Sequence, residues 1–143
     1  MKIYLASPFF NETEIKNVIK AKEILTSKQL QVYVPMDNQL NRKNKTRKQW
    51  ATDTFNMDVE QIKNSDVIVM LYYGCYSDSG TAWECGLAYG LNKPVVAIHL
   101  HEGKSNCMIN SSCLANLKAI NELLKYDFNV MPAISYYLNE VIG

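Results

Sequence analysis

The chain has 143 residues and a mass of 16.3 kDa, which predicts one compact domain over residues 1–143. Hydrophobic residues make up 48% and charged residues 20%, a mixture that argues against a disordered or fibrous protein. The formal net charge of +1 gives no electrostatic footprint for a nucleic-acid polymer or an anionic membrane, and no apolar run reaches the roughly 18 residues of a membrane span.

The cysteines and the opening residues predict a cytoplasmic protein. Cys75, Cys85, Cys107 and Cys113 form no C-x-x-C pair and no zinc-like spacing, so we expect reduced thiols. The first ten residues carry one Lys and a short apolar stretch, which does not match a secretory signal. We therefore expect a protein that handles a small molecule, without a cofactor.

Strands and helices are expected to alternate along the chain. Residues 2–6 are rich in aromatic and branched side chains and predict the first strand, and Asn11 with Glu14 predicts a capping box for a helix that runs to about Lys28. Similar patterns predict, in order, a strand at 31–34, a polar loop at 37–48, a helix from 45–50 to about 64, a buried strand at 67–71, a helix at 80–91 and a strand at 95–100.

The remaining residues predict a fifth strand at 116–120, a short helix capped by Asn121 and running through Tyr126, and a last short helix opened by Pro132. This order is typical of an α/β fold, a doubly wound parallel sheet with helices on both faces. Such sheets bind ligands at the carboxyl ends of their strands. We therefore expect the site in the segments at 6–10, 35–40, 72–80 and 99–110.

Asp58 is the first acidic residue in an unexpected place. It shares a stripe of the second helix with Ala51, Phe55 and Ile62, because their spacing of 4, 3 and 4 residues keeps them on one face. A buried carboxylate without partners is costly, so Asp58 is either bonded to loop amides or part of a site.

Glu84 repeats this pattern on the third helix. It shares a face with Leu87, Ala88 and Leu91, close to the helix start, where the helix dipole favours the ionised form. A nucleophilic carboxylate has these properties, because it must be ionised, partly desolvated and held in one rotamer.

Asp78 lies just before this helix, with a turn between it and Glu84. One interpretation is an N-cap; the other is a second carboxylate that faces the same cavity as Glu84, with Gly80 between them allowing another group to approach the backbone. Two carboxylates in different environments can divide the roles of nucleophile and proton-carrying acid.

Other candidate sites are weaker. His99 and His101 could suggest a metal, but the sequence offers no third ligand, and the glycines fit neither a P-loop nor a dinucleotide fingerprint. The basic run at 42–48 is expected to be solvated, with contact to a phosphate as the alternative. Cys85 has no His base in its sequence context, which argues against thiol chemistry.

Taken together, these residues resemble the nucleoside 2-deoxyribosyltransferase family over most of the chain. The most specific feature is D-x-G-x-x-x-E between a strand and a helix, together with a Tyr in the first strand and an Asp on the second helix. The resemblance is carried by the stretches at 3–9 (IYLASPF), 35–39 (PMDNQ), 51–58 (ATDTFNMD), 78–84 (DSGTAWE) and 126–129 (YDFN).

The resemblance implies a flavodoxin-like sheet of five parallel strands and transfer of 2-deoxyribose between purine or pyrimidine bases. Glu84 matches the nucleophile that attacks C1′ and holds a deoxyribosyl ester. Asp78 matches the acid that protonates the leaving base, Tyr4 matches the hydroxyl that positions the nucleophile, and Asp58 matches a second carboxylate near base and nucleophile.

The resemblance also implies how substrate and subunits bind. Phe9 and Gln39 fall in the loops of the base pocket, beside Gly80. Asn110 matches an Asn that a neighbouring subunit lends to the sugar hydroxyls. The expected partners are 2′-deoxyribonucleosides, free bases and further copies of the chain, in a homo-oligomer built from dimers, up to a hexamer.

Two other functions stay open from the sequence. A related hydrolase would cleave deoxynucleoside 5′-monophosphates with water, but it would need phosphate donors near the first loop, where Ser7 is followed by Pro8 and Phe9. A non-catalytic nucleotide-binding module would use the same sheet, but it has no need of Glu84 on an apolar face.

Overall fold

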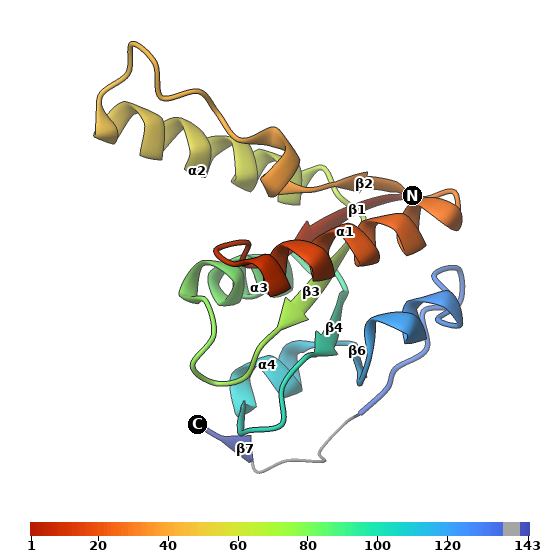
Figure 1. The fold of residues 1–143 in the computed structure, drawn as a ribbon. Coiled ribbons are helices and arrows are strands. Elements are labelled where there is room, and N and C mark those ends of the chain that lie inside the picture. Colours follow the sequence, from red (N-terminus) through yellow and green to blue (C-terminus); the bar gives the residue numbers. More distant parts are fainter. Residues whose placement is uncertain (136–140) are drawn as a thin grey trace.

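The central element of the computed structural model, which describes residues 1–135 and 141–143, is a parallel sheet (Figure 1). Its strand order is β2-β1-β3-β4-β6, the flavodoxin-like order, in which the switch point lies between β1 and β3. This confirms the expected fold. The strands are β1 (Lys2–Ala6), β2 (Gln31–Tyr33), β3 (Val67–Tyr72), β4 (Val95–His99) and β6 (Ala115–Leu117).

Helices cover both faces of this sheet. One face packs against α1 and the 3₁₀ helix η2, and the other against α2, α3 and α4. A small parallel pair, β5 with β7, lies beside α4 near the end of the chain (Figure 1). The bounds are α1 (Glu12–Ser27), η1 (Pro35–Asn38), α2 (Arg47–Lys63), α3 (Ser79–Gly90), β5 (Ser105–Asn106), α4 (Cys107–Ser112), η2 (Ile120–Leu124) and β7 (Val141–Ile142).

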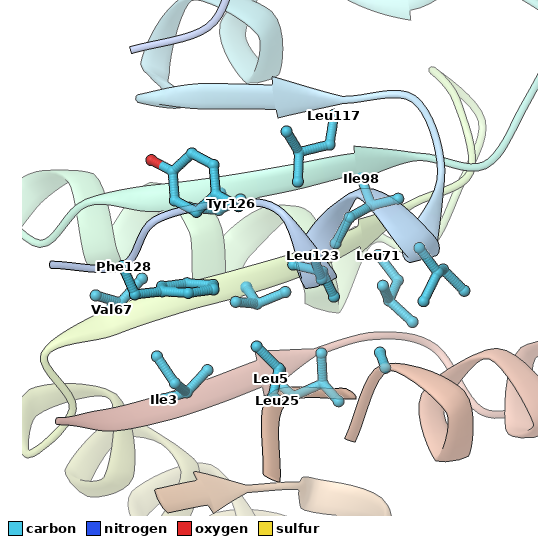
Figure 2. Close-up of a cluster of buried hydrophobic side chains, with 14 of the residues drawn as sticks. Ile3, Leu5, Leu25, Val67, Leu71, Ile98, Leu117, Leu123, Tyr126 and Phe128 are labelled. Carbon is cyan, nitrogen blue, oxygen red and sulfur yellow. The ribbon is translucent and has the colours of Figure 1, made fainter. Parts of the chain in front are cut away.

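The alternation of side chains along the strands creates two cores. In β1, Ile3 and Leu5 point to the α1 side, while Tyr4 and Ala6 point to the α2 and α3 side. All six residues of β3 are buried, as expected for a central strand covered on both faces. Figure 2 shows the first core, where side chains from the strands meet Leu25 of α1 and the segment at 123–128.

Local sequence accounts for the helix starts. The Asn11 side chain accepts a hydrogen bond from the Glu14 amide, as predicted, although the Glu14 carboxylate accepts its return bond from Phe10 rather than from Asn11. Thr46 and Gln49 form a complete capping box at the start of α2.

The predicted stripe on α2 is buried only at its C-terminal end. Ile62 is fully buried, but Ala51 is exposed and Phe55 is 52% exposed. The reason is geometric, because α2 projects beyond the sheet, with much of its length away from the strands (Figure 1). Asp58 lies between the exposed and the buried part of this stripe and is itself half-buried.

The C-terminal predictions need two corrections. Asn121 caps no helix, because η2 begins after Ala119, and the Glu122 carboxylate accepts from the Ala119 amide. Pro132 opens no helix in residues 131–135. The Ile134 amide donates to the Leu114 carbonyl, and the Ile134 carbonyl accepts from the Asn116 amide, which keeps this segment extended. The rest of that predicted helix, at 136–140, lies outside the described residues. Within the part described, no helix is long and apolar enough to cross a membrane.

Candidate active site

A hydrogen bond between Tyr4 and Glu84 lies at the centre of the candidate site. Tyr4 is fully buried on β1, and its hydroxyl donates to Glu84 Oε1 over 2.8 Å. Burial, with the nearby Glu84 and Asp58 carboxylates, raises the pKa of Tyr4 far above its ordinary value. Tyr4 is therefore neutral and can only donate to an ionised Glu84, which fixes the orientation of the carboxylate.

The protonation of Glu84 is set by competing effects. Burial raises the pKa of Glu84 to about 7, the Tyr4 hydrogen bond opposes that rise, and the carboxylates of Asp58 and Asp78 add to it. Burial therefore outweighs the Tyr4 hydrogen bond, and Glu84 is protonated more readily than an exposed glutamate. A carboxylate with this pKa is about half ionised at pH 7.

Asp58 joins the site through a pair of tyrosines. The parallel register places Tyr33 of β2 directly opposite Tyr4, and the two rings stack with centroids 5.6 Å apart. Burial raises the pKa of Asp58 to about 6, and the Tyr33 hydroxyl opposes that rise. Oδ1 of Asp58 is buried and accepts no hydrogen bond from the residues described, so the alternative of a carboxylate bonded to loop amides is wrong for this atom.

Asp78 combines a structural role with a place in the site. Its Oδ2 accepts bonds from both the amide and the hydroxyl of Thr81, each over 2.8 Å, which caps α3. A Cβ at Gly80 would lie 3.2 Å from Asp78 Oδ2, so the glycine keeps this turn open. Because both bonds use Oδ2, the other oxygen can face a ligand.

These carboxylates line a cavity of about 570 Å³ at the carboxyl end of β1. Its volume falls in the range of small-molecule sites. Tyr4 lies behind Glu84, outside the wall. Of the predicted site residues, the cavity wall contains Phe9, Gln39, Asp58, Asp78, Gly80 and Glu84.

Asn110 lies apart from this cavity. It is on α4, only 5% exposed, and its carbonyl accepts a bond from Asn116 Nδ2. Its predicted role toward a neighbouring subunit stays a prediction.

The structure adds residues that the sequence reasoning missed. The Arg42 guanidinium lies 3.9 Å above the Trp50 ring, and both line the cavity, whereas Lys45 of the same basic run pairs with exposed Asp53. The Trp50 indole donates to the Leu40 carbonyl, which anchors the loop to α2. Tyr33 could have been found by aligning the two strands in parallel register. Arg42 was expected only as part of the basic run at 42–48, and its place in the cavity wall depends on the course of the loop, which no local pattern shows.

Comparisons with known proteins identify the family and the fold of the chain. The model of the nucleoside 2-deoxyribosyltransferase family matches residues 3–131. A nucleoside deoxyribosyltransferase of Lactobacillus leichmannii is 27% identical over 148 aligned positions, covering 94% of each chain. A 2-deoxyribosyltransferase structure from Bacillus psychrosaccharolyticus is 38% identical with a TM-score of 0.88, covering 96% of this chain and all of that one. A Clostridium botulinum CMP N-glycosidase shares the fold, with a TM-score of 0.60 at 16% identity over 87% of this chain and 96% of that one. The chain belongs to the nucleoside 2-deoxyribosyltransferase family.

Proposed function

We propose that this protein transfers 2-deoxyribose from one nucleobase to another, and that Glu84 holds the sugar as a covalent ester between the two half-reactions. The observation that carries the proposal is the Tyr4–Glu84 hydrogen bond at the wall of a cavity that also contains Asp58 and Asp78. Family membership supports the reaction, and the geometry supports the roles of the residues.

In the first half-reaction, the ionised Glu84 carboxylate attacks C1′ while the bond from C1′ to the base nitrogen breaks. The electron pair of that bond leaves with the base, and a protonated Asp78 gives its proton to the departing base. The transition state has oxocarbenium character, which an adjacent carboxylate stabilises. The missing 2′-hydroxyl makes this cation easier to form, so carboxylates can suffice.

In the second half-reaction, a nitrogen of the acceptor base attacks C1′ from the side that the first base left. The C1′–O bond to Glu84 breaks, its electron pair returns to the carboxylate, and Asp78 takes the proton that the acceptor base loses. Two inversions give net retention at C1′. The raised pKa of Asp58 suits a group that shares a proton with the base.

The base pocket is aromatic and adaptable. Phe9 stacks on Phe10 with centroids 6.1 Å apart at one side of the cavity, and Trp50 lies in the wall of the same cavity. Stacking tolerates different bases because every base has a π-face. Gln39 adds an amide that can both donate to and accept from a base edge.

A variant pair tests the covalent role. Glu84→Ala should abolish base exchange between 2′-deoxyinosine and a second free base while nucleoside binding, measured by calorimetry, survives. Glu60→Gln removes an exposed carboxylate of α2 and should leave exchange unchanged. A slow substrate with fluorine at the 2′ position of its sugar should add the mass of that sugar to the peptide that contains Glu84. Full exchange by Glu84→Ala would refute the proposal.

One observation favours hydrolysis of 5′-monophosphates as a second candidate, namely the Arg42 cation in the cavity wall. Rates of free deoxyribose 5-phosphate release and of base exchange should be compared side by side. We expect exchange on plain nucleosides to be faster. Faster cleavage of a 5′-monophosphate, lost in Arg42→Ala, would favour the hydrolase.

We also propose that copies of this chain associate over α2 and α3. Phe55 and Trp83 are about half exposed, and the centroids of their rings lie 5.3 Å apart. Both line a hollow of about 460 Å³, whose wall shares Asp58 and Glu84 with the main cavity. A second copy would cover these rings and exclude water from the carboxylates. Light scattering should give a multiple of 16.3 kDa, and Trp83→Glu should reduce both mass and activity.

We also propose that the protein resides in the cytoplasm and acts as one domain over residues 1–143. All four cysteines are free, and the Sγ atoms of Cys85 and Cys113 lie 3.9 Å apart without a bond, which suits a reducing compartment.

A further inference from the structure

Two cysteine thiols face each other where α3 packs against α4. Cys85 lies on the buried face of α3, and Cys113 caps the end of α4. Their Sγ atoms lie 3.9 Å apart, and the Ser112 hydroxyl oxygen lies 3.9 Å from Cys85 Sγ. Both cysteines belong to the buried cluster on the α2 and α3 side of the sheet, so the packing of this core holds the two sulfurs in contact.

The packing leaves the two sulfurs close to bonding distance. The side chains that α3 buries are Thr81, Cys85 and Ala88, and their small size lets α4 lie close to this helix. The sulfurs of a disulfide are about 2.05 Å apart, so the bond would form after an approach of about 1.9 Å.

We propose that Cys85 and Cys113 are an oxidation site, at which a peroxide converts the two thiols into a disulfide that slows base exchange until a thiol reductant restores it. Neither cysteine lines the Glu84 cavity, so the pair has no part in the proposed reaction itself. The effect on exchange rests on the proposed function, whereas the formation of the disulfide does not.

The ionisation of the pair supports the chemistry. The Cys113 hydrogen bond lowers the pKa of the Cys85 thiol, although burial opposes it. Bonding to Cys85, together with burial, raises the pKa of Cys113. Because a thiolate and not a thiol attacks an oxidant, Cys85 is the sulfur that reacts first, and Cys113 keeps its proton for the second step.

The two steps consume one hydrogen peroxide. The Cys85 thiolate attacks one peroxide oxygen, the O–O bond breaks, and the departing hydroxide takes up the proton that Cys85 has released; Cys85 is then a sulfenic acid. The Cys113 sulfur attacks the Cys85 sulfur, the S–O bond breaks, and the hydroxyl leaves with the Cys113 proton as water. Two thiols are thus oxidised to one disulfide, and the peroxide is reduced to two molecules of water.

The approach of the sulfurs must move α3. Cys113 is anchored from the other side, because the next residue, Leu114, donates its amide to the Val95 carbonyl of β4 over 2.9 Å. A large share of the approach of about 1.9 Å therefore falls on Cys85 and its helix.

A movement of α3 reaches the proposed nucleophile directly, since Glu84 is the residue before Cys85. The Tyr4 hydroxyl, which donates to Glu84 over 2.8 Å, belongs to β1 and does not move with α3. A displacement of about 1 Å would stretch this bond beyond hydrogen-bonding distance and misplace the carboxylate. Misplacement by this much can reduce a rate by up to about 10²-fold.

Burial determines which oxidants can act. Cys85 is fully buried and Cys113 is 8% exposed, so we expect a slow reaction with a small oxidant such as hydrogen peroxide. Cys75 and Cys107 are partly exposed and can react independently, so a chain that carries Cys75→Ser and Cys107→Ser isolates the pair.

Peroxide treatment of this doubly substituted chain tests the proposal. After alkylation under denaturing conditions, mass spectrometry should find two alkyl groups on the untreated chain and none on the treated chain. Digestion without reductant should yield a peptide in which Cys85 and Cys113 are linked. Base exchange should fall about tenfold or more on treatment and recover with dithiothreitol.

Cys113→Ser in the same background is the matched control, because it removes one sulfur and leaves Cys85 in place. It should form no linked peptide and should not show the loss of exchange that dithiothreitol reverses. Stable oxidation of Cys85 to the sulfinic acid in the chain that keeps Cys113 would overturn the proposal, and so would a linked chain that exchanges bases at the untreated rate. If the untreated chain exchanges no bases, the proposed function fails, while the linked peptide still decides whether the disulfide forms.

Discussion

Tyr4→Phe removes the hydroxyl that donates to Glu84 and little else, because Tyr4 is fully buried and the phenyl ring keeps its stacking on Tyr33. A hydrogen bond to a charged group contributes about 1.5–3 kcal/mol. The Tyr4 bond lowers the pKa of Glu84, so its loss raises that pKa further.

The size of the effect follows from these numbers. One pKa unit corresponds to about 1.4 kcal/mol, so the acid-side midpoint of kcat/KM should move from about 7 to between about 8 and about 9. At pH 7 the ionised fraction of Glu84 then falls from about one half to between about 10% and about 1%, a loss of roughly 5-fold to 50-fold in rate. The loss should shrink at higher pH, where the carboxylate is ionised again.

The assay is base exchange from 2′-deoxyinosine to a second free base, followed by chromatography across pH. Tyr33→Phe is the matched control, since the Tyr33 hydroxyl acts on Asp58, and it should leave the Glu84 midpoint near 7. A Tyr4→Phe profile with an unchanged midpoint, or with equal loss at every pH, would refute the reasoning and leave Tyr4 a space-filling role only.

Three further predictions concern the other carboxylates and the core. Asp78→Asn keeps an N-cap side chain, so the melting temperature should be retained while kcat falls about 10²–10⁴-fold for bases that need a proton to leave. A lower melting temperature with no such fall in kcat would make Asp78 only a cap. Burial raises the pKa of Glu84 from 4.5 to about 7, so the folded chain loses stability as pH rises through that interval. In denaturant titrations near pH 8, Glu84→Gln should therefore be more stable than the unmodified chain, by at most about 3 kcal/mol of unfolding free energy. Near pH 4 the variant should show no gain. Leu25→Ala opens a cavity in the core beside α1 and should cost about 2–5 kcal/mol of unfolding free energy, while exchange at low temperature persists.

The regular elements near the start of the chain could be predicted closely. The alternation of Ile3, Tyr4 and Leu5 and the cap at Asn11 are local signals, and the structure follows them. Segments after β4 were predicted less well, because β5 and α4 are too short to show a period. Their positions depend on partners far along the chain, such as the pairing of Ser105 with Val141.

For the site, the sequence determined which side chains are chemically unusual. Glu84 and Asp58 stood out because a carboxylate on an apolar stripe violates the pattern of its own helix. Residue types and helical spacing are local properties, so they can be read without the fold. The resemblance to a family added a role for Tyr4 that spacing alone did not supply.

Only the tertiary structure decided how these groups act on one another. Tyr4 and Glu84 are 80 residues apart, and their hydrogen bond exists because β1 and α3 pack together. The balance of burial against that bond sets the pKa of Glu84 near 7, and no local pattern contains either contribution. Composition and spacing identify the reactive groups. Distances and burial, which require the folded chain, determine the ionisation of these groups and the orientation of their side chains.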